Sequence, residues 1–263
     1  MTPILSVRDL EKTFGSVVAA RDISLDVPPQ QTVGIIGANG AGKTTFVNMI
    51  TGHIRPSKGT IRFEDRDITG LPSRTITRLG ISRSFQVAQV FPSLTVFENM
   101  CVATAVSRGS GGMLARMLAP LRSPEIADEA EAAIELFGVA SARDVRASTL
   151  PQGMRKLLDI AMAVAGGPRV LLLDEPTSGI SIEEKYGLMD TVMAALRSRG
   201  ITVLFVEHDM EIVSRFADRV LAFYDGTVIA DGTPETTLGD PKVQQYVTGT
   251  TLRVHGAART AHA

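Results

Sequence analysis

The spacing of apolar residues along the chain predicts strands and helices in alternation. Short runs of β-branched and other apolar residues predict strands at 4–7, 23–27, 32–37, 59–63, 81–86, 170–174, 202–207, 219–223 and 227–230. Apolar residues at helical spacing predict helices at 43–50, 153–165, 182–199 and 210–216. This alternation is typical of a parallel sheet with crossover helices. The sequence therefore predicts an α/β fold.

A stretch from Thr95 to Leu150 interrupts the alternation. Helical patterns at about 95–106 and 125–137 flank a segment, 109–124, that is rich in Gly, Met, Leu and Arg. We interpret about 95–165 as a helical subdomain inserted into one domain that covers 1–250, and 251–263 as a disordered tail. Within the insert, one apolar helical face either packs inside the protein or contacts a permease or a membrane surface. Its residues are Met113, Leu114, Met117, Leu118 and Leu121.

Composition and charge narrow the range of functions that this protein can have. The 263 residues are 44% hydrophobic and 21% charged, as in globular proteins. A net charge of −1 gives no basic field for nucleic acid, and Cys101, the single cysteine, excludes an intramolecular disulfide. No signal peptide is expected at the start of the sequence, and no apolar run approaches the ~18 residues that span a bilayer. If the protein works at a membrane, another subunit spans it.

A glycine-rich loop joins the strand at 32–37 to the helix at 43–50. It matches the phosphate-binding pattern G-x-x-x-x-G-K-[ST] in full. Glycines let the backbone wrap closely around an anion, and the N-terminus of the following helix adds partial positive charge. We expect Lys43 to reach the β- and γ-phosphates and the Thr44 hydroxyl to ligate Mg²⁺. The predicted ATP-binding residues are Gly37, Ala38, Asn39, Gly40, Ala41, Gly42, Lys43, Thr44 and Thr45.

Two carboxylates follow the apolar strand at 170–174. Asp174 lies at the carboxyl end of a predicted parallel strand, where ligands bind in such sheets, and suits a water-mediated contact with Mg²⁺. Glu175 follows it and can polarise the attacking water as a general base. Acidic residues at the end of a strand are, by themselves, as often solvated surface residues as catalytic ones. Together with the phosphate loop it predicts a catalytic site.

Gln86 and His208 end two further apolar strands. The carboxyl ends of parallel strands meet at one edge of a sheet, so both side chains are expected near the phosphate loop. Gln86 can reach Mg²⁺ and the attacking water, and His208 can contact the γ-phosphate. The predicted catalytic residues are Glu175, His208, Gln86 and Lys43, and the predicted Mg²⁺ ligands are Thr44, Gln86 and Asp174.

In their order along the chain, these residues resemble those of the ATP-binding-cassette (ABC) ATPases. The matching features are the adenine-stacking aromatic Phe14, the Walker A loop Gly37–Thr44, the Q-loop Gln86, the Walker B Asp174, the catalytic Glu175 and the switch His208. The resemblance implies a P-loop NTPase core with an antiparallel β subdomain and an inserted α-helical subdomain. It also implies ATP hydrolysis, with ATP and Mg²⁺ bound.

Other stretches resemble one branch of that family, the ATPases of branched-chain amino acid importers. They are 82–86, 90–99, 207–210, 232–235 and the long insert near 107–125. Systems for urea, amides or other amino acids share these features, and lipid or polysaccharide exporters use the same kind of cassette. Because the cassette does not touch the transported molecule, the solute and the direction of transport stay open.

Two elements depart from the family pattern. The signature Leu-Ser-Gly-Gly-Gln aligns with Leu150, Pro151, Gln152, Gly153 and Met154, and only Leu150 and Gly153 match. Ser181 stands where the D-loop has aspartate. In the family both elements act across a dimer, on the partner's nucleotide. The resemblance implies a second ABC ATPase as partner, in a homodimer or a heterodimer. Because the residues that serve this chain's own Walker A site match the family, the two departures suggest the hypothesis that the partner is a different ATPase and that the two ATP sites are unequal.

The resemblance implies further partners: transmembrane permease subunits and, indirectly, a solute-binding protein. It places the chain peripherally on the cytoplasmic face of the inner membrane. The segment 87–94 either forms part of a groove for a permease helix or packs in the core. ABC ATPases of DNA repair or translation are a rival class, but they usually carry a coiled-coil insertion or tandem cassettes, which this sequence lacks. A binding module that hydrolyses little is a second rival, and Glu175 and His208 argue against it.

Overall fold

A six-stranded sheet forms the centre of the computed structural model, which describes residues 2–84, 88–108 and 123–249. The strand order is β10-β9-β3-β8-β7-β6, and all neighbours are parallel except β9 and β10. This confirms the predicted α/β class. The strands are β3 (Thr32–Gly37), β6 (Ile81–Ser84), β7 (Val170–Asp174), β8 (Thr202–Val206), β9 (Arg219–Tyr224) and β10 (Thr227–Gly232).

A second, antiparallel sheet has the order β2-β1-β4-β5. Its strands are β1 (Leu5–Phe14), β2 (Val17–Val27), β4 (Lys58–Phe63) and β5 (Arg66–Asp67). The sequence predicted only 4–7 and 23–27 of the long hairpin. Both strands continue to the turn at Gly15, where Phe14 pairs with Val17. The outer half of the hairpin is largely exposed, so its residues carry no apolar pattern that marks a strand.

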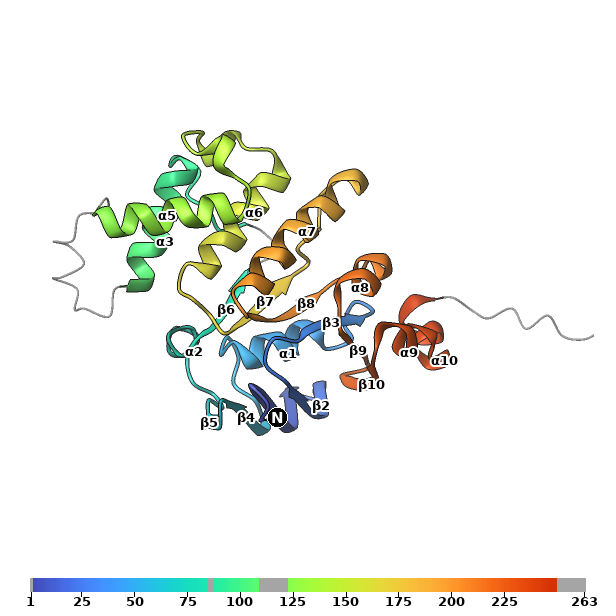
Figure 1. The fold of residues 1–263 in the computed structure, drawn as a ribbon. Coiled ribbons are helices and arrows are strands. Elements are labelled where there is room, and N and C mark those ends of the chain that lie inside the picture. The colour runs from blue at the N-terminus through green and yellow to red at the C-terminus, as the bar shows by residue number, and fades with distance from the viewer. Residues whose placement is uncertain (1, 85–87, 109–122, 250–263) are drawn as a thin grey trace, which may run out of the picture.

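Helix α1 (Lys43–Ile50) lies between the two sheets (Figure 1). Its fully buried Phe46 and Ile50 join an apolar core with Leu5 from one sheet and Leu204 from the other. This packing fixes the helix against both sheets, with its N-terminus following directly from β3 and the glycine-rich loop. The short helix α2 (Ser73–Leu79), which the sequence did not predict, leads into β6.

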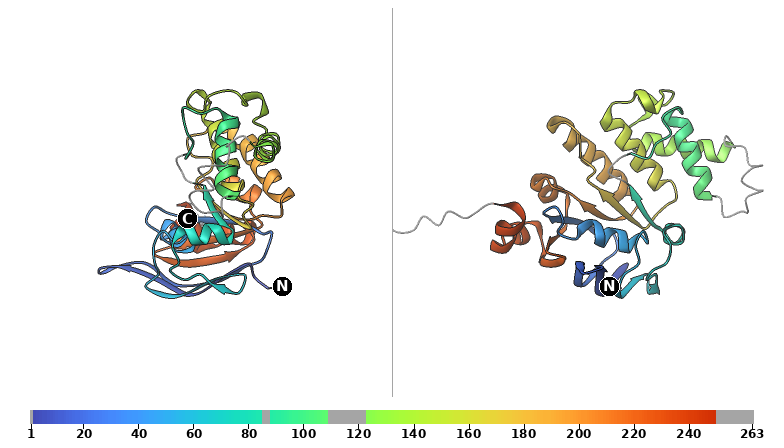
Figure 2. Two further views of the ribbon diagram at one scale, coloured as in Figure 1. Left: turned by 90° about the vertical axis from the view of Figure 1, so that its left-hand side faces the viewer. Right: turned by 180° about the vertical axis from the view of Figure 1, so that it is seen from behind.

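The opposite face of the central sheet is covered by helices, which share one large apolar core with it. They are α6 (Gln152–Val164), α7 (Ile182–Ser198) and α8 (Met210–Phe216). Helices α3 (Val96–Arg108) and α5 (Pro124–Leu136) pack on each other and on α6, so that this helical part projects from the sheet in all three views (Figures 1 and 2). Two 3₁₀ turns, Ala140–Ala142 and Ala147–Thr149, lead from α5 to α6.

The last part of the described chain packs beside β9 and β10. It consists of α9 (Pro234–Gly239), α10 (Pro241–Val243) and a π-helical turn, Gln244–Thr248, none of which the sequence predicted. Gln86, the apolar face at 113–121 and the tail 251–263 lie outside the described residues. Across 2–84, 88–108 and 123–249, no helix has the length and apolar character that a membrane span requires.

Candidate functional site

The glycine-rich loop connects β3 to α1 through backbone shapes that only glycine accepts easily. Gly37 has φ +153°, and a Cβ on it would lie 2.5 Å from the carbonyl oxygen of Phe223. Gly42, the residue before α1, has φ +101°, and a Cβ there would lie 2.7 Å from the carbonyl oxygen of Ala19. The loop therefore needs glycine at both positions for its close turns and close backbone approaches.

Lys43 lies inside this loop. Its side-chain Nζ donates to the carbonyl oxygens of Gly37 at 2.6 Å and Ala38 at 3.0 Å. Burial lowers the pKa of Lys43, against the opposing effect of the negative charges on Glu175 and Asp174. The ammonium group is therefore held at the centre of the loop, beside the strand-end carboxylates.

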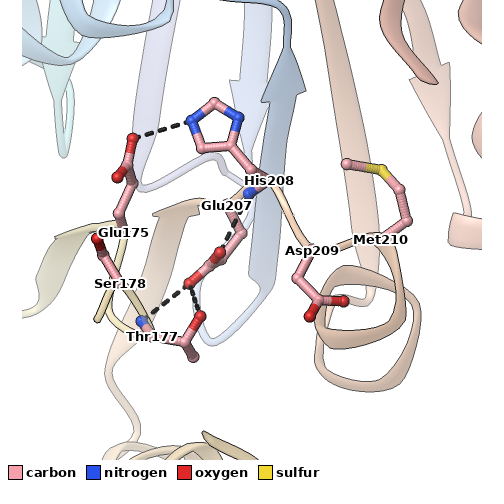
Figure 3. Close-up of a pocket in the computed structure, with 7 residues that line it drawn as sticks. All are labelled: Glu175, Thr177, Ser178, Glu207, His208, Asp209 and Met210. Atoms are coloured by element: carbon pink, nitrogen blue, oxygen red, sulfur yellow. Dashed lines mark hydrogen bonds and ion pairs between the residues drawn. The ribbon is translucent and has the colours of Figure 1, made fainter. Parts of the chain in front are cut away.

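One pocket brings the predicted phosphate loop together with residues from two other strand ends. Its lining includes Asn39 through Thr45, together with Glu175 after β7 and His208 after β8. A second pocket adjoins it and shares Glu175 and His208 (Figure 3). The structure thus gathers, around one opening, residues that are more than 130 positions apart in the sequence (Lys43 to Glu175).

Glu175 and His208 contact each other directly. The Nε2 atom of His208 lies 2.9 Å from Oε1 of Glu175, with the carboxylate and the ring facing one another (Figure 3). Glu175 has φ +47°, a left-handed conformation that is costly for a residue with a side chain. Its N–H donates to the carbonyl oxygen of Val206, which ties the end of β7 to β8. Strained backbone of this kind clusters at functional sites.

Asp174 is held by a buried arginine that the sequence analysis did not single out. The guanidinium of Arg83, on β6, donates to Oδ2 of Asp174 and to Oδ1 of Asn48 on α1, each at 2.6 Å. Only 8% of the Arg83 side chain and 16% of the Asp174 side chain are exposed. Arg83 therefore joins β6, β7 and α1. In the sequence, a charged residue within a short and otherwise buried strand was the signal that could have identified Arg83.

The segment that contains Gln86 lies outside the described residues, but both of its flanks are fixed by one carboxylate. Asp159 on α6 accepts from the Ser84 hydroxyl at 2.6 Å and from the Gln89 N–H at 2.7 Å. Asp159 is 5% exposed, and burial raises its pKa, against the effect of these hydrogen bonds. The helix that begins at the signature is thus bonded directly to both sides of 85–88.

The donor atoms near the loop suit Mg²⁺ bound together with a nucleotide. Thr44 presents an exposed side chain in the pocket, and Asp174, which does not line the pocket, provides a carboxylate at the end of β7. In the described part of the chain, no group of at least three His, Cys, Asp or Glu residues could hold a metal by itself. Mg²⁺ commonly relies on one or two protein oxygens, substrate phosphates and waters, so this sparse set fits it.

The signature and D-loop positions lie next to each other, at the start of α6 and of α7. Pro151 is the N-cap of α6 and makes no side-chain cap, whereas Ser181 caps α7 by accepting from the Glu184 N–H. Gln152 donates to the Ser178 carbonyl oxygen at 3.4 Å. Leu150 is buried, and Gly153 and Met154 are partly buried. Pro151 and Ser181, the two residues that depart from the family pattern, therefore each stand at the start of a regular helix.

Phe14 lies at the tip of the β1–β2 hairpin. Its ring is exposed, and the Lys12 ammonium lies 4.9 Å from the ring centroid. Phe14 does not line the pocket formed by the phosphate loop. An exposed aromatic face of this kind is available for stacking.

The fold and the phosphate loop define a P-loop ATPase. The family model described as "ABC transporter" matches residues 20–178. The chain therefore belongs to the ABC transporter family, as an ATP-binding cassette with ATPase activity, and the resemblance found in the sequence is confirmed.

Known relatives cover nearly all of the chain. It is 37% identical over 245 residues to the "High-affinity branched-chain amino acid transport ATP-binding protein LivG" of Escherichia coli (strain K12), covering 92% of this chain and 96% of LivG. A probable branched-chain amino acid transport ATP-binding protein LivG of Archaeoglobus fulgidus is 32% identical over 249 residues, covering 94% and 95%. The ADP conformation of MJ1267, an ATP-binding cassette of an ABC transporter, has a TM-score of 0.82 at 29% identity, covering 93% and 98%.

Proposed function

We propose that this chain hydrolyses ATP to drive the import of branched-chain amino acids. The observation that carries the catalytic part is the 2.9 Å contact between His208 and Glu175 at the pocket of the phosphate loop. It pairs a carboxylate that can accept a proton with a side chain that can contact a γ-phosphate. The solute is inferred from the printed names of the relatives.

The proposed reaction is in-line attack of water on the γ-phosphorus, which breaks the bond to the leaving oxygen of ADP and gives ADP and phosphate. Glu175 orients the water and accepts its proton, while His208, held by Glu175, contacts the γ-phosphate. The loop N–H groups and Lys43 hold the phosphates, and Lys43 exchanges its two carbonyl partners for phosphate oxygens. Phe14 stacks on the adenine.

Mg²⁺, when bound, neutralises phosphate charge. Thr44, Asp174 and Gln86 are the residues proposed to hold it, with Asp174 acting through a water molecule. The Arg83 contact to Oδ2 of Asp174 orients this carboxylate.

The first experiment co-expresses the chain with the products of its neighbouring genes and compares ATP turnover of wild type and Glu175→Gln in the purified complex. We expect turnover to collapse in the variant while ATP still binds. An unchanged rate would refute the role of Glu175. For the solute, the complex is reconstituted in liposomes with its solute-binding protein, and uptake of labelled leucine is compared with uptake of urea. Uptake of urea alone would reject the amino acid assignment.

The proposed setting is peripheral, on the cytoplasmic face of the inner membrane, where the chain joins transmembrane permease subunits and a second ABC ATPase. A different second ATPase is favoured because Pro151 and Ser181, which act in trans in the family, both depart from the pattern. The residues of the chain's own phosphate loop do not. The ATP site that faces Pro151 is then the slower one, since a hydrogen bond to a charged group contributes about 1.5–3 kcal/mol.

Pro151→Ser tests this asymmetry in the assembled complex. The variant should raise ATP turnover, because the serine hydroxyl supplies the missing donor to the nucleotide on the partner subunit. Pro151→Ala is the matched control, because it removes the proline without adding a hydroxyl. No increase with serine, or an equal increase with alanine, would reject the hypothesis.

A further inference from the structure

Glu207 is a buried carboxylate between the two loops that carry Glu175 and His208. It follows directly after β8 and is 4% exposed. Its Oε1 accepts from both the N–H of Thr177 at 3.0 Å and the Thr177 hydroxyl at 2.6 Å. Its Oε2 accepts from the N–H of His208 at 3.1 Å. Both carboxylate oxygens are therefore engaged, one by each loop (Figure 3).

These bonds join two segments that are 30 positions apart in the sequence. Thr177 is two residues after Glu175, and Glu207 is one residue before His208. Thr177, which donates two of these bonds, is also buried, with 8% of the residue exposed. A charge-assisted hydrogen bond in such surroundings is short and directional, so it restricts the relative position of the two loops.

The backbone at Glu175 requires such a restraint. Its φ of +47° is strained, and a strained conformation persists only where the surrounding structure holds it on both sides. Before Glu175, β7 is paired along its length with β8. After it, Thr177 is fixed by Glu207, and the Ser178 N–H returns to the Glu175 carbonyl oxygen at 3.1 Å. Glu207 thus restrains the loop that leaves Glu175, together with the Gln152 side chain, which donates to the Ser178 carbonyl oxygen.

We infer that Glu207 is a positioning residue for ATP hydrolysis: through Thr177 and the His208 N–H it holds Glu175 and His208 at their contact distance. This inference rests on the proposed roles of Glu175 and His208. It assigns Glu207 no contact with nucleotide or water. Loss of the restraint lets Glu175 leave its left-handed conformation, which misplaces the proton acceptor without changing the phosphate loop.

The test removes one bond at a time. Thr177→Val keeps the shape of the side chain and removes the hydroxyl that donates to Glu207, whereas Thr177→Ser keeps the hydroxyl. Glu207→Gln keeps the length of the side chain but replaces one of its two acceptor oxygens with a donor. Thr191→Val is the matched control, because the Thr191 hydroxyl donates to the Gly187 carbonyl oxygen within its own helix, α7.

All variants are measured in the purified complex for kcat and KM, and in the full chain for ATP affinity and melting temperature. Thr177→Val and Glu207→Gln should lower kcat about 10- to 100-fold, the range expected for a hydrogen bond to a charged group, and leave ATP affinity within about twofold. Thr177→Ser and Thr191→Val should stay close to wild type. Amide hydrogen exchange of the peptide 175–182 should speed up in Glu207→Gln, because that loop opens more easily.

The outcomes separate the inference from the function on which it rests. If Glu175→Gln abolishes turnover but a folded Thr177→Val retains kcat within about twofold, the positioning role is wrong and the proposed chemistry stands. Retained turnover in Glu175→Gln overturns both. A loss of ATP affinity equal to the loss of kcat would make Glu207 a general structural residue. Should Thr177→Val not fold, Glu207→Asp, which keeps the charge and shortens the reach, must show the same loss of kcat, or the inference fails.

Discussion

Arg83→Met is the substitution whose effect on stability follows most directly from the structure. The change keeps an unbranched apolar stem and removes the guanidinium that donates at 2.6 Å to both Asn48 and Asp174. The Asp174 carboxylate, with 16% of its side chain exposed, would lose its cationic partner. A buried charge without its partner is strongly unfavourable in the folded state.

The burial of the two side chains sets limits on how much unfolding free energy Arg83→Met loses. Removing one partner of a buried ion pair costs about 3–5 kcal/mol. Because the Asp174 side chain is partly exposed, water relieves some of that cost, and we expect the lower end, about 3 kcal/mol. In a domain of this size, 1 kcal/mol shifts the melting temperature by about 2–4 °C, so a fall of about 6–12 °C is expected.

Thermal and urea unfolding of the purified full chain measure this loss. Arg21→Met is the matched control, because its ion pair with Asp225 is exposed at 47% and 69% of the two side chains and contributes less than about 1 kcal/mol. Adding Asp174→Asn to Arg83→Met should recover part of the stability, since it removes the uncompensated charge. A loss below about 1 kcal/mol, or strictly additive effects in the double variant, would refute the reasoning.

Three further predictions concern single groups. Burial lowers the pKa of Lys43, so the charged form of its side chain costs stability in the folded chain. Without ATP, Lys43→Met should therefore be no less stable than wild type. The variant should, however, lose the rise in melting temperature that ATP gives to wild type. Burial raises the pKa of Asp159, so its ionised form costs stability above the folded-state pKa, and the cost disappears as the pH falls through that pKa toward 3.8. The urea midpoint of wild type minus that of Asp159→Asn should therefore increase as the pH is lowered from above the folded-state pKa toward 3.8. A difference that does not change with pH would contradict this. Ser181→Ala should cost about 1 kcal/mol of unfolding free energy by removing the α7 cap, whereas Ser181→Asp, with an equally good capping side chain, should not.

Strands β3 and β8 of the central sheet were predictable because they are mostly apolar and buried on both faces. All residues of β3 and β8 are buried, so each stands out as a continuous apolar run between polar segments. The outer β1–β2 hairpin and α2 gave no comparable pattern. In α2 only Ile76 is buried, which leaves no period to detect.

The phosphate loop and the strand-end residues were predictable for a different reason. They are the residues that we propose bind one ligand, and the chemistry of that ligand demands particular residue types at fixed spacing. The residues that hold them in place have no such requirement: Arg83 and Glu207 act through partners, Asp174 and Thr177, that only the folded sheet brings near. Their sequence signal was an ionisable residue within or just after an apolar strand, and solvated strand ends on a protein surface carry the same signal.

The order of strands also has a consequence for how the chain matures during synthesis. Strand β3, which leads into the phosphate loop, pairs with β8 and β9, and its residue Thr32 faces Val203. Its partners therefore emerge from the ribosome long after it does, and pairing across such a separation is slow. Until then β3, whose residues are all buried in the folded chain, stays unpaired and prone to aggregation. Because the phosphate loop directly follows β3, a nucleotide that binds only the folded chain stabilises the completed pairing of β3 with β8 and β9.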